Sequence, residues 1–230
     1  MTPPREVIAA FGADDVAMFK PLDMDGAALE WQAEVLASLE PDGFRVAAPL
    51  RARDGSLVVG GWTAWPRLEG RHEPRWAEIV AVGERFHRAL AGFPRPAVLD
   101  ARTDPWAHAD RIAWDEGDVH DDPDIARLLA ARRPVDAPEQ LIHGDLSGNV
   151  LFADSLPPAV IDFSPYWRPA GYASAIVVAD AVAWYGARPS VLATVDRQLL
   201  IRAVLFRLLC AADLEAARRE FRPALQALAA

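Results

Sequence analysis

The 230-residue sequence contains little cysteine, little lysine and no long hydrophobic run. Its single cysteine, Cys210, excludes an internal disulfide, and its apolar helical surroundings predict a buried, inert thiol. The longest apolar segment, residues 172–185, is interrupted by Asp180 and is too short to span a bilayer, so we expect no membrane crossing. The sequence also lacks a Cys and His metal cluster, a Walker-type lysine loop and an internal repeat, which argues against those classes of protein.

Lysine is the scarcest charged residue, because every one of the 24 basic residues except Lys20 is an arginine. The formal net charge of −9 argues against a nucleic-acid partner and against an anionic membrane surface. Hydrophobic residues make up 52% and charged residues 25% of the chain, as in an ordinary soluble globular protein. The first residues have no apolar signal-peptide core, so we expect a cytoplasmic protein.

What is present is a polar cluster around a predicted β-hairpin. Two short apolar runs, Val150–Phe152 and Ala159–Ile161, flank a polar turn at residues 153–158. If the two runs pair antiparallel, Asn149 lies just before the first strand and Asp162 just after the second. Both side chains are therefore expected at the same open end of the hairpin.

A third oxygen-bearing side chain, Asp145, approaches that end from the preceding loop, where Gly144 and Gly148 permit unusual backbone angles. Oxygen ligands of this kind suit Mg²⁺, which is typically held by one or two carboxylates together with substrate phosphates. The remaining acid can orient a hydroxyl group and take its proton. The alternative is that these stretches rich in Asp, Gly and Asn are ordinary turns around a hairpin.

The residues His143-Gly144-Asp145, Asn149 and Ile161-Asp162 resemble the motif of the phosphotransferase enzyme family, which includes aminoglycoside and choline kinases and is related to the protein kinases. The resemblance implies ATP as the phosphate donor and Asp145 as the catalytic base. It implies that Asn149 and Asp162 hold Mg²⁺, and that His143 is a structural residue that fixes the loop backbone.

The same resemblance extends to residues outside the hairpin. Lys20 follows the apolar run 16–19, where kinase-like families place a lysine that contacts nucleotide phosphates; the alternative is an ordinary exposed lysine. Gln32 occupies the position of the glutamate that pairs with this lysine in the family. Asp180 resembles the helix carboxylate that braces the catalytic loop, since an acid on an apolar helix needs a partner.

Residues 65–70 resemble the hinge between the lobes of a kinase, where adenine bonds to the backbone. Pro66 has no N–H, so the donor is expected to be Trp65 or Arg67. Before this segment, Asp54-Gly55 predicts a hairpin between strands at residues 44–52 and 56–64. Helical spacing predicts helices at residues 3–11, 26–39, 73–91, 104–114, 172–185, 190–214 and 214–229.

Two departures from the family pattern support a second hypothesis. The family usually spaces its Asp and Asn by five residues, whereas Asp145 and Asn149 are four apart. Only residues 12–15 separate the first helix from the lysine strand, which leaves no room for a glycine-containing hairpin over the nucleotide phosphates. Together with Gln32, these features favour the alternative of a catalytically silent, kinase-like binding or regulatory protein.

Three further segments have two interpretations each. The acidic stretch 115–124 suits a cationic small-molecule acceptor, or is simply a solvated loop. Residues 165–169 form one wall of an acceptor pocket, or pack as a stiff aromatic loop. His87, beside the apolar stripe of the helix at 73–91, is expected to be a packing residue rather than a catalytic one.

The sequence as a whole predicts an α+β, two-lobed protein-kinase-like fold. We expect a small N-terminal sheet lobe at residues 1–64, which binds the nucleotide, and a mainly helical C-terminal lobe at residues 65–230, which carries the catalytic hairpin. The predicted activity is an ATP- and Mg²⁺-dependent phosphotransfer to a hydroxyl group of a small molecule.

Overall fold

The computed structural model describes residues 2–12, 16–114 and 121–229. The chain forms two compact units. The first consists of Met1–His72 and Val150–Ile161, and the second of Glu73–Asn149 and Asp162–Ala230. The predicted lobes, at residues 1–64 and 65–230, divide the chain differently from these two units, and they stay a prediction.

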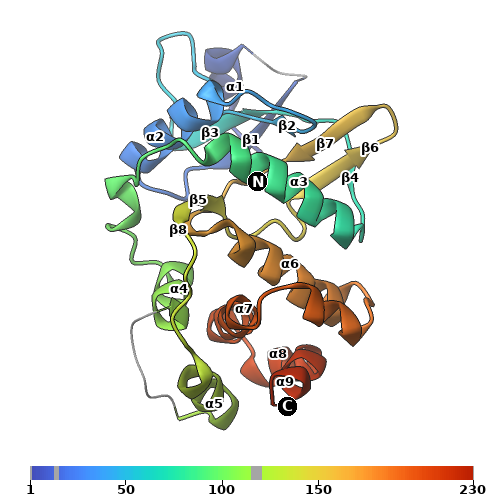
Figure 1. Cartoon of the computed structure of the whole chain (residues 1–230). Coiled ribbons are helices and arrows are strands. Elements are labelled where there is room, and N and C mark those ends of the chain that lie inside the picture. The colour runs from blue at the N-terminus through green and yellow to red at the C-terminus, as the bar shows by residue number, and fades with distance from the viewer. Residues whose placement is uncertain (1, 13–15, 115–120, 230) are drawn as a thin grey trace. The chain divides into compact units, whose positions relative to one another are not determined.

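The first unit contains helices from its N-terminal segment and short strands from both of its chain segments (Figure 1). Asp25 caps its longest helix by accepting hydrogen bonds from the amides of Ala27 and Ala28, at 2.9 and 3.4 Å. The elements of this unit are α1 Arg5–Phe11, β1 Ala17–Pro21, α2 Gly26–Ser38, β2 Arg45–Val46, β3 Trp62–Pro66, β4 Arg71–His72, β6 Val150–Ala153 and β7 Leu156–Val160.

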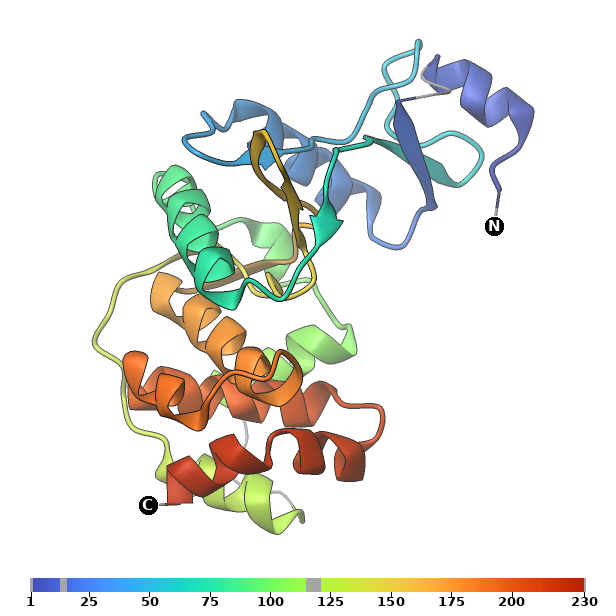
Figure 2. The same ribbon diagram turned by 90° about the vertical axis from the view of Figure 1, so that its right-hand side faces the viewer.

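The strands of the first unit form two sheets. One contains β1 and β3, and the other has the order β2-β7-β6-β4, so the hairpin lies between two strands from the N-terminal segment (Figure 2). The antiparallel β6 and β7 confirm the predicted hairpin. Its turn is shorter than predicted, because Pro157 and Pro158 belong to β7.

The regular hairpin predicted between residues 44–52 and 56–64 is wrong, although Leu50 and Ala64 of these segments form an isolated antiparallel bridge. The strand β2 pairs in parallel with β7, whereas β3 pairs antiparallel with β1. The Asp54-Gly55 turn does form, with the Gly55 amide donating to the Ala52 carbonyl at 2.9 Å, but regular strands do not continue from both sides of it. A turn signal fixes a local reversal of the chain, and the partner of each strand is decided by the rest of the fold.

The second unit is mainly helical. Its elements are α3 Trp76–Leu90, α4 Pro105–Trp114, α5 Pro123–Ala131, β5 Glu139–His143, β8 Pro165–Pro169, α6 Ala170–Trp184, α7 Arg197–Cys210, α8 Leu214–Glu220 and α9 Arg222–Ala229, with short 3₁₀ turns at Ala97–Leu99 and Pro189–Thr194. The predicted helices are present, although the segment at 190–214 begins as a 3₁₀ turn and 214–229 is two helices.

The core of the second unit is built around α6, whose residues from Ala175 to Ala181 are all buried. Helices α3 and α7 pack against it, and α4 packs against α7 (Figure 1). The strands β5 and β8 form a two-stranded antiparallel sheet that brings Ile142 opposite Tyr166 and His143 opposite Pro165. This pairing places the end of β5 beside the segment that follows Asp162.

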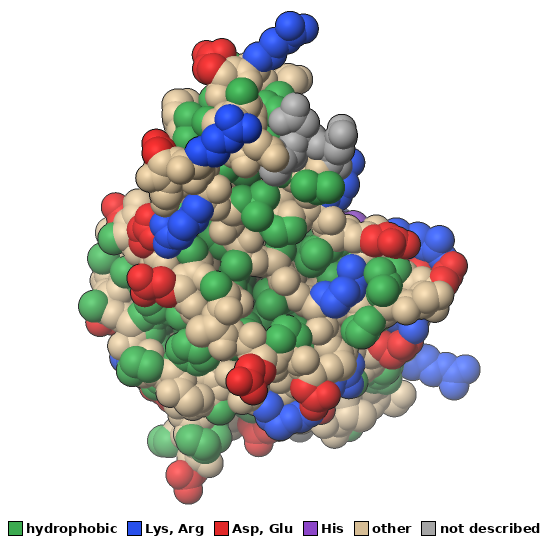
Figure 3. Space-filling view, turned by 90° about the horizontal axis from the view of Figure 1, so that it is seen from above, with side chains coloured by type: hydrophobic (Ala, Val, Ile, Leu, Met, Phe, Trp, Pro, Cys, Tyr) green, Lys and Arg blue, Asp and Glu red, His purple; other side chains and the backbone are tan. Residues whose placement is uncertain are grey.

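The negative charge of the chain is not gathered on the face drawn in Figure 3, where acidic and basic side chains are interspersed. Cys210 is half-buried, and burial raises the pKa of its thiol to about 12, in keeping with the predicted inert role. Across the described residues, every helix is too short or too polar to cross a membrane.

Candidate active site

The loop that carries Asp145 connects β5 to β6 and is held by backbone contacts. The amide of Gly144 donates to the Ser164 carbonyl at 2.9 Å, and a side chain at Gly144 would overlap the ring of Tyr166. The amide of Asn149 donates to the Leu146 carbonyl at 2.9 Å, which closes a tight turn. Gly148 in this turn has φ +80°, a conformation that favours glycine.

His143 joins this loop to the segment after β7. Its side chain is fully buried, and its Nδ1 accepts the amides of Asp145 at 3.2 Å and Ser164 at 3.5 Å. Its own amide donates to Nε2 of His87 at 3.1 Å. His87 is therefore a buried packing residue with a backbone partner, and the contacts of His143 fit the structural role that the family motif implies.

Asp145 lies at the surface of the second unit, with 41% of its side chain exposed. The Asn149 amide nitrogen, Nδ2, donates to the Asp145 carbonyl at 2.7 Å and to Asp145 Oδ2 at 3.3 Å. The other carboxylate oxygen, Oδ1, accepts a hydrogen bond from Nη2 of Arg207 at 2.9 Å. Asp145 and Asn149 are thus brought together as predicted, and Arg207 joins them.

Arg207 is a site residue that sequence reasoning missed. It lies on α7 and binds the fully buried Asp180 of α6 through two hydrogen bonds, Nε to Oδ1 at 2.9 Å and Nη2 to Oδ2 at 2.6 Å. Burial by itself would lower the pKa of Arg207, but the Asp180 and Asp145 carboxylates outweigh it, so the pKa is raised. A single arginine in the apolar run 203–210 was the available signal, because a buried charge requires a partner.

Asp162 follows β7 with φ +48°, and it is the one residue other than glycine with a positive φ in the described part of the chain. Aspartate tolerates this region better than most residues do, yet the conformation still costs free energy. The hydroxyl of Ser164 donates to the Asp162 carbonyl at 3.3 Å. Backbone strain of this kind is typical of residues that a site holds in a particular orientation.

The side-chain oxygen atoms of Asn149 and Asp162 are of the chemical type that binds a magnesium ion. Because Nδ2 of Asn149 donates to Asp145, the amide oxygen Oδ1 remains as an acceptor. Among the described residues there is no group of three or more His, Cys, Asp or Glu side chains that could hold a metal ion. One carboxylate and one amide oxygen suit Mg²⁺, which keeps several waters and takes further ligands from substrate phosphates.

The residues expected to contact the nucleotide belong to the first unit. Nζ of Lys20 lies 5.6 Å from the centre of the Trp65 ring, and burial lowers the pKa of Lys20 while Asp23 opposes the shift. The amide of Arg67 donates to the Val16 carbonyl at 2.7 Å, so this donor already has a partner within the unit. Glu30, which flanks Gln32, forms an ion pair with Arg51 at 2.7 Å.

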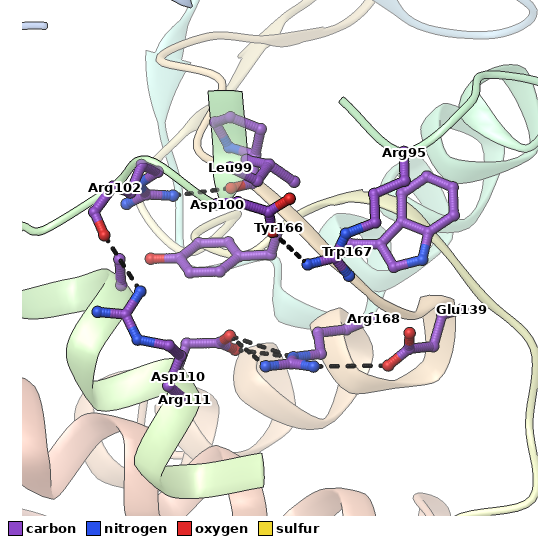
Figure 4. A pocket seen from close by; sticks show the side chains of 12 residues that line it. Arg95, Leu99, Asp100, Arg102, Asp110, Arg111, Glu139, Tyr166, Trp167 and Arg168 are labelled. Carbon is purple, nitrogen blue, oxygen red and sulfur yellow. Dashed lines mark hydrogen bonds and ion pairs between the residues drawn. The ribbon is translucent and has the colours of Figure 1, made fainter. Parts of the chain in front are cut away.

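The second unit contains a cavity of about 460 Å³ beside β8 (Figure 4). Residues 165–168 form one wall of it, so this segment is a strand that lines a pocket. Arg168 pairs with Asp110 at 2.8 Å and with Glu139 at 3.5 Å, and Arg102 lies over the Tyr166 ring at 4.8 Å. The charged side chains of this cavity are therefore largely matched in pairs.

Most of the acidic stretch, residues 115–120, lies outside the described residues. Of the remaining acids, Asp122 caps α5 and pairs with Arg218. Asp124 pairs with Arg218 at 3.1 Å and with Arg127 at 3.0 Å. These two carboxylates therefore already have cationic partners within the second unit.

A model of the phosphotransferase enzyme family matches residues 12–176. Among solved structures, the chain is similar to spectinomycin phosphotransferase APH(9)-Ia in complex with ADP and spectinomycin, with a TM-score of 0.53 and 14% identity. The similarity covers 91% of this chain and 82% of that one, and it confirms the predicted α+β, kinase-like fold. No curated protein matches the chain.

Proposed function

The chain belongs to the phosphotransferase enzyme family, and we propose that it transfers the γ-phosphoryl group of ATP to a hydroxyl group of a small molecule with the help of Mg²⁺. The observation that carries the proposal is the geometry of the 144–149 loop. His143 Nδ1 accepts the Asp145 amide, and Asn149 Nδ2 donates back to the Asp145 carbonyl. A loop closed from both sides is what a positioned acid requires.

In the proposed reaction, Asp145 orients the acceptor hydroxyl and takes its proton. The hydroxyl oxygen forms a bond to the γ-phosphorus, the bond to the leaving ADP oxygen breaks, and the hydroxyl proton passes to Asp145. Oδ2 of Asp145 is the oxygen for this role, because its hydrogen bond from Asn149 is long, at 3.3 Å, whereas Oδ1 accepts a shorter one from Arg207, at 2.9 Å. Family membership favours this activity over the silent, kinase-like binding protein, which was the alternative hypothesis.

Asn149 and Asp162 would hold Mg²⁺ through oxygen atoms, and the bound ion would neutralise charge that develops on the phosphates. Lys20 is proposed to contact those phosphates, and Trp65 to line the adenine site. We assign Arg67 no backbone donor role, because its amide donates to Val16.

The acceptor is best sought with a panel rather than a single compound. Asp122 and Asp124 already have arginine partners, so their charges add little support for a cationic acceptor. The similar protein of known structure was solved with spectinomycin, and aminocyclitols and aminoglycosides therefore belong in the panel beside neutral polyols and amino alcohols.

The test measures ADP formation and acceptor phosphorylation by the purified chain with ATP, Mg²⁺ and the panel. The change Asp145→Asn should lower the rate by about 10²–10⁴-fold, because a positioned general base contributes this much. Mg²⁺-dependent ATP binding, measured by calorimetry, should persist in this variant, because Asp145 is not one of the proposed ligands.

The matched control is Asp154→Asn, the same chemical change at an exposed aspartate in the turn of the β6–β7 hairpin. It should leave both readouts near the wild-type values. Equal rates for the two variants, or an absence of Mg²⁺-dependent ATP binding and turnover in the wild type, would contradict the proposed function.

A further inference from the structure

Helix α7 contains two arginines whose side chains are largely buried, Arg202 and Arg207, and they have different kinds of partner. Arg202 donates to the carbonyls of Gln198 at 3.1 Å and Arg133 at 2.9 Å, and it lies over the Trp114 ring. These contacts join helix segments to one another. The contacts of Arg207, in contrast, lead to the loop that carries the proposed base.

The guanidinium of Arg207 is fixed from several directions. Asp180 accepts two of its hydrogen bonds, and the rings of Trp184 and Phe206 lie 5.4 and 5.6 Å from it. Only 12% of the Arg207 side chain is exposed, and Asp180 is fully buried. A planar guanidinium held in this way has little freedom left, so its remaining Nη2 hydrogen bond points in a defined direction.

That remaining bond reaches Oδ1 of Asp145 at 2.9 Å. The Asp145 side chain is 41% exposed, so close packing does not hold it on every side. Within the loop, Oδ2 of this carboxylate accepts a long hydrogen bond from Nδ2 of Asn149, at 3.3 Å. The shorter contact, from Arg207 outside the loop, therefore contributes more than Asn149 to holding the carboxylate in one orientation.

We propose that Arg207 is a positioning residue, which uses the buried Asp180 as an anchor to hold Oδ1 of Asp145 and thereby aims Oδ2 at the acceptor hydroxyl. This inference rests on the proposed function. Phosphoryl transfer depends mainly on the placement and electrostatic stabilisation of the reacting groups, so loss of this contact slows the chemical step. Nucleotide affinity does not depend on it.

Lysine is the informative substitution at this position. The change Arg207→Lys keeps a positive charge for the buried Asp180, but a compact ammonium group cannot reproduce the planar fork that serves Asp180 and Asp145 together. We expect kcat to fall by roughly tenfold or more, while the KM for ATP stays within about twofold of wild type, since misplacement of a catalytic group by a fraction of an ångström is costly.

A second variant removes the contact without leaving a buried charge unpaired. The double change Arg207→Met with Asp180→Asn replaces the buried pair by an apolar and a neutral side chain, which avoids the uncompensated carboxylate that Arg207→Met alone would leave. It should show the same selective loss of kcat. Asp180→Asn alone keeps Arg207 available to Asp145 and is expected to lose less.

The matched control is Arg202→Met on the same helix. It should lower the unfolding temperature and leave kcat near the wild-type value at temperatures where the protein is folded. In a third arm, free guanidinium ion at concentrations well below those that unfold the protein should restore part of the activity of Arg207→Ala. The same addition should not raise the activity of Arg202→Ala.

The outcomes separate this inference from the proposed function. An inactive wild type would overturn the proposed function and this inference with it. An active wild type, with Arg207→Lys at the wild-type kcat or with the double variant no slower than Asp180→Asn alone, would overturn the positioning role and leave the proposed function intact. A proportional rise in the KM for ATP instead of a fall in kcat would also overturn it.

Discussion

At the scale of single residues, the site depends on buried polar groups that fix a surface loop. His143 and Asp180 are fully buried, and each contacts the Asp145 loop, directly or through Arg207. Such groups are costly to bury unless their hydrogen bonds are satisfied. Their convergence on the loop of one exposed carboxylate indicates a constraint on that carboxylate.

His87 extends this network and makes the stability of the protein depend on pH. Burial, and to a smaller extent His143, lowers the pKa of His87 to about 3, against an ordinary value of 6.5. Between these two values the unfolded chain binds a proton at this position and the folded chain does not. The free energy of unfolding therefore falls as the pH drops from about 6.5 towards 3, by up to about 1.4 kcal/mol per pH unit.

The measurement is urea denaturation between pH 7 and pH 4 for the wild type and for His87→Gln. Glutamine keeps an oxygen acceptor for the His143 amide but does not titrate, so the variant should lose less stability on acidification. The difference between the two curves isolates His87 from the carboxylates that titrate in the same range. Parallel curves would mean that His87 contributes nothing to acid sensitivity.

The sequence predicted the residues that we propose to carry the chemistry more readily than the residues that support them. Asp145, Asn149 and Asp162 stand in a local motif, and local spacing is visible in one dimension. Arg207 lies 62 positions from Asp145 and 27 from Asp180, so only the fold shows that it joins them. An acid on the apolar helix α6 did indicate a missing partner, although it did not say which residue.

At the scale of elements, strand β8 shapes the loop through one close approach. The Tyr166 ring lies where a side chain on Gly144 would have to be, and Tyr166 itself is buried beside Phe206. The β5–β8 pairing holds this ring in place by setting Tyr166 opposite Ile142. Glycine at position 144 is therefore a requirement of packing between a strand and a loop.

The change Gly144→Ala should lower the free energy of unfolding by about 1–3 kcal/mol, because a methyl group forced into a packed contact displaces its neighbours. It should also reduce phosphotransfer by shifting the adjacent Asp145. Chemical denaturation and the transfer assay measure the two effects.

Gly92→Ala is the control, since a Cβ there would meet no atom within 4 Å. It should behave like the wild type in both assays. If the two variants were equally stable and active, the loop would have more room beside Tyr166 than the packing indicates.

Periodicity located most helices because each carries its own pattern of buried positions. Strand partners were harder to predict, and the hairpin expected at 44–64 shows why. Its Asp54-Gly55 turn is real, yet Val46 lies opposite Val160 of β7, more than a hundred residues later. No local signal distinguishes that distant partner from the nearer one.

At the scale of the whole molecule, the four-stranded sheet of the first unit consists of strands from two separate segments of the chain. Val160 is fully buried and lies opposite Val150 of β6 on one side and Val46 of β2 on the other. The chain enters this hairpin directly after Asn149 and leaves it directly before Asp162. The two proposed magnesium ligands therefore flank the segment that completes the sheet.

The change Val160→Ala should destabilise this sheet by about 2 kcal/mol through the loss of buried methyl groups. Hydrogen exchange followed by mass spectrometry should then show faster exchange at β2 as well as in the hairpin, because the strands share one set of contacts. The effect at β2 would appear more than a hundred residues from the substitution.

Val178→Ala makes the same chemical change in α6 of the second unit, where Val178 is also buried. Its effect should be greatest at α3, α6 and α7, which pack together. Identical exchange patterns for the two variants would contradict the division of the chain into two compact units.

The arrangement of this sheet also affects how the chain can fold during its synthesis on the ribosome. Strands β2 and β4 emerge early, but their partners β7 and β6 are made only after residues 73–149. Until then both early strands expose unsatisfied edges, which are open to pairing with other chains. Synthesis therefore begins with the first unit, but this unit cannot complete its four-stranded sheet until residues 150–161 have been made.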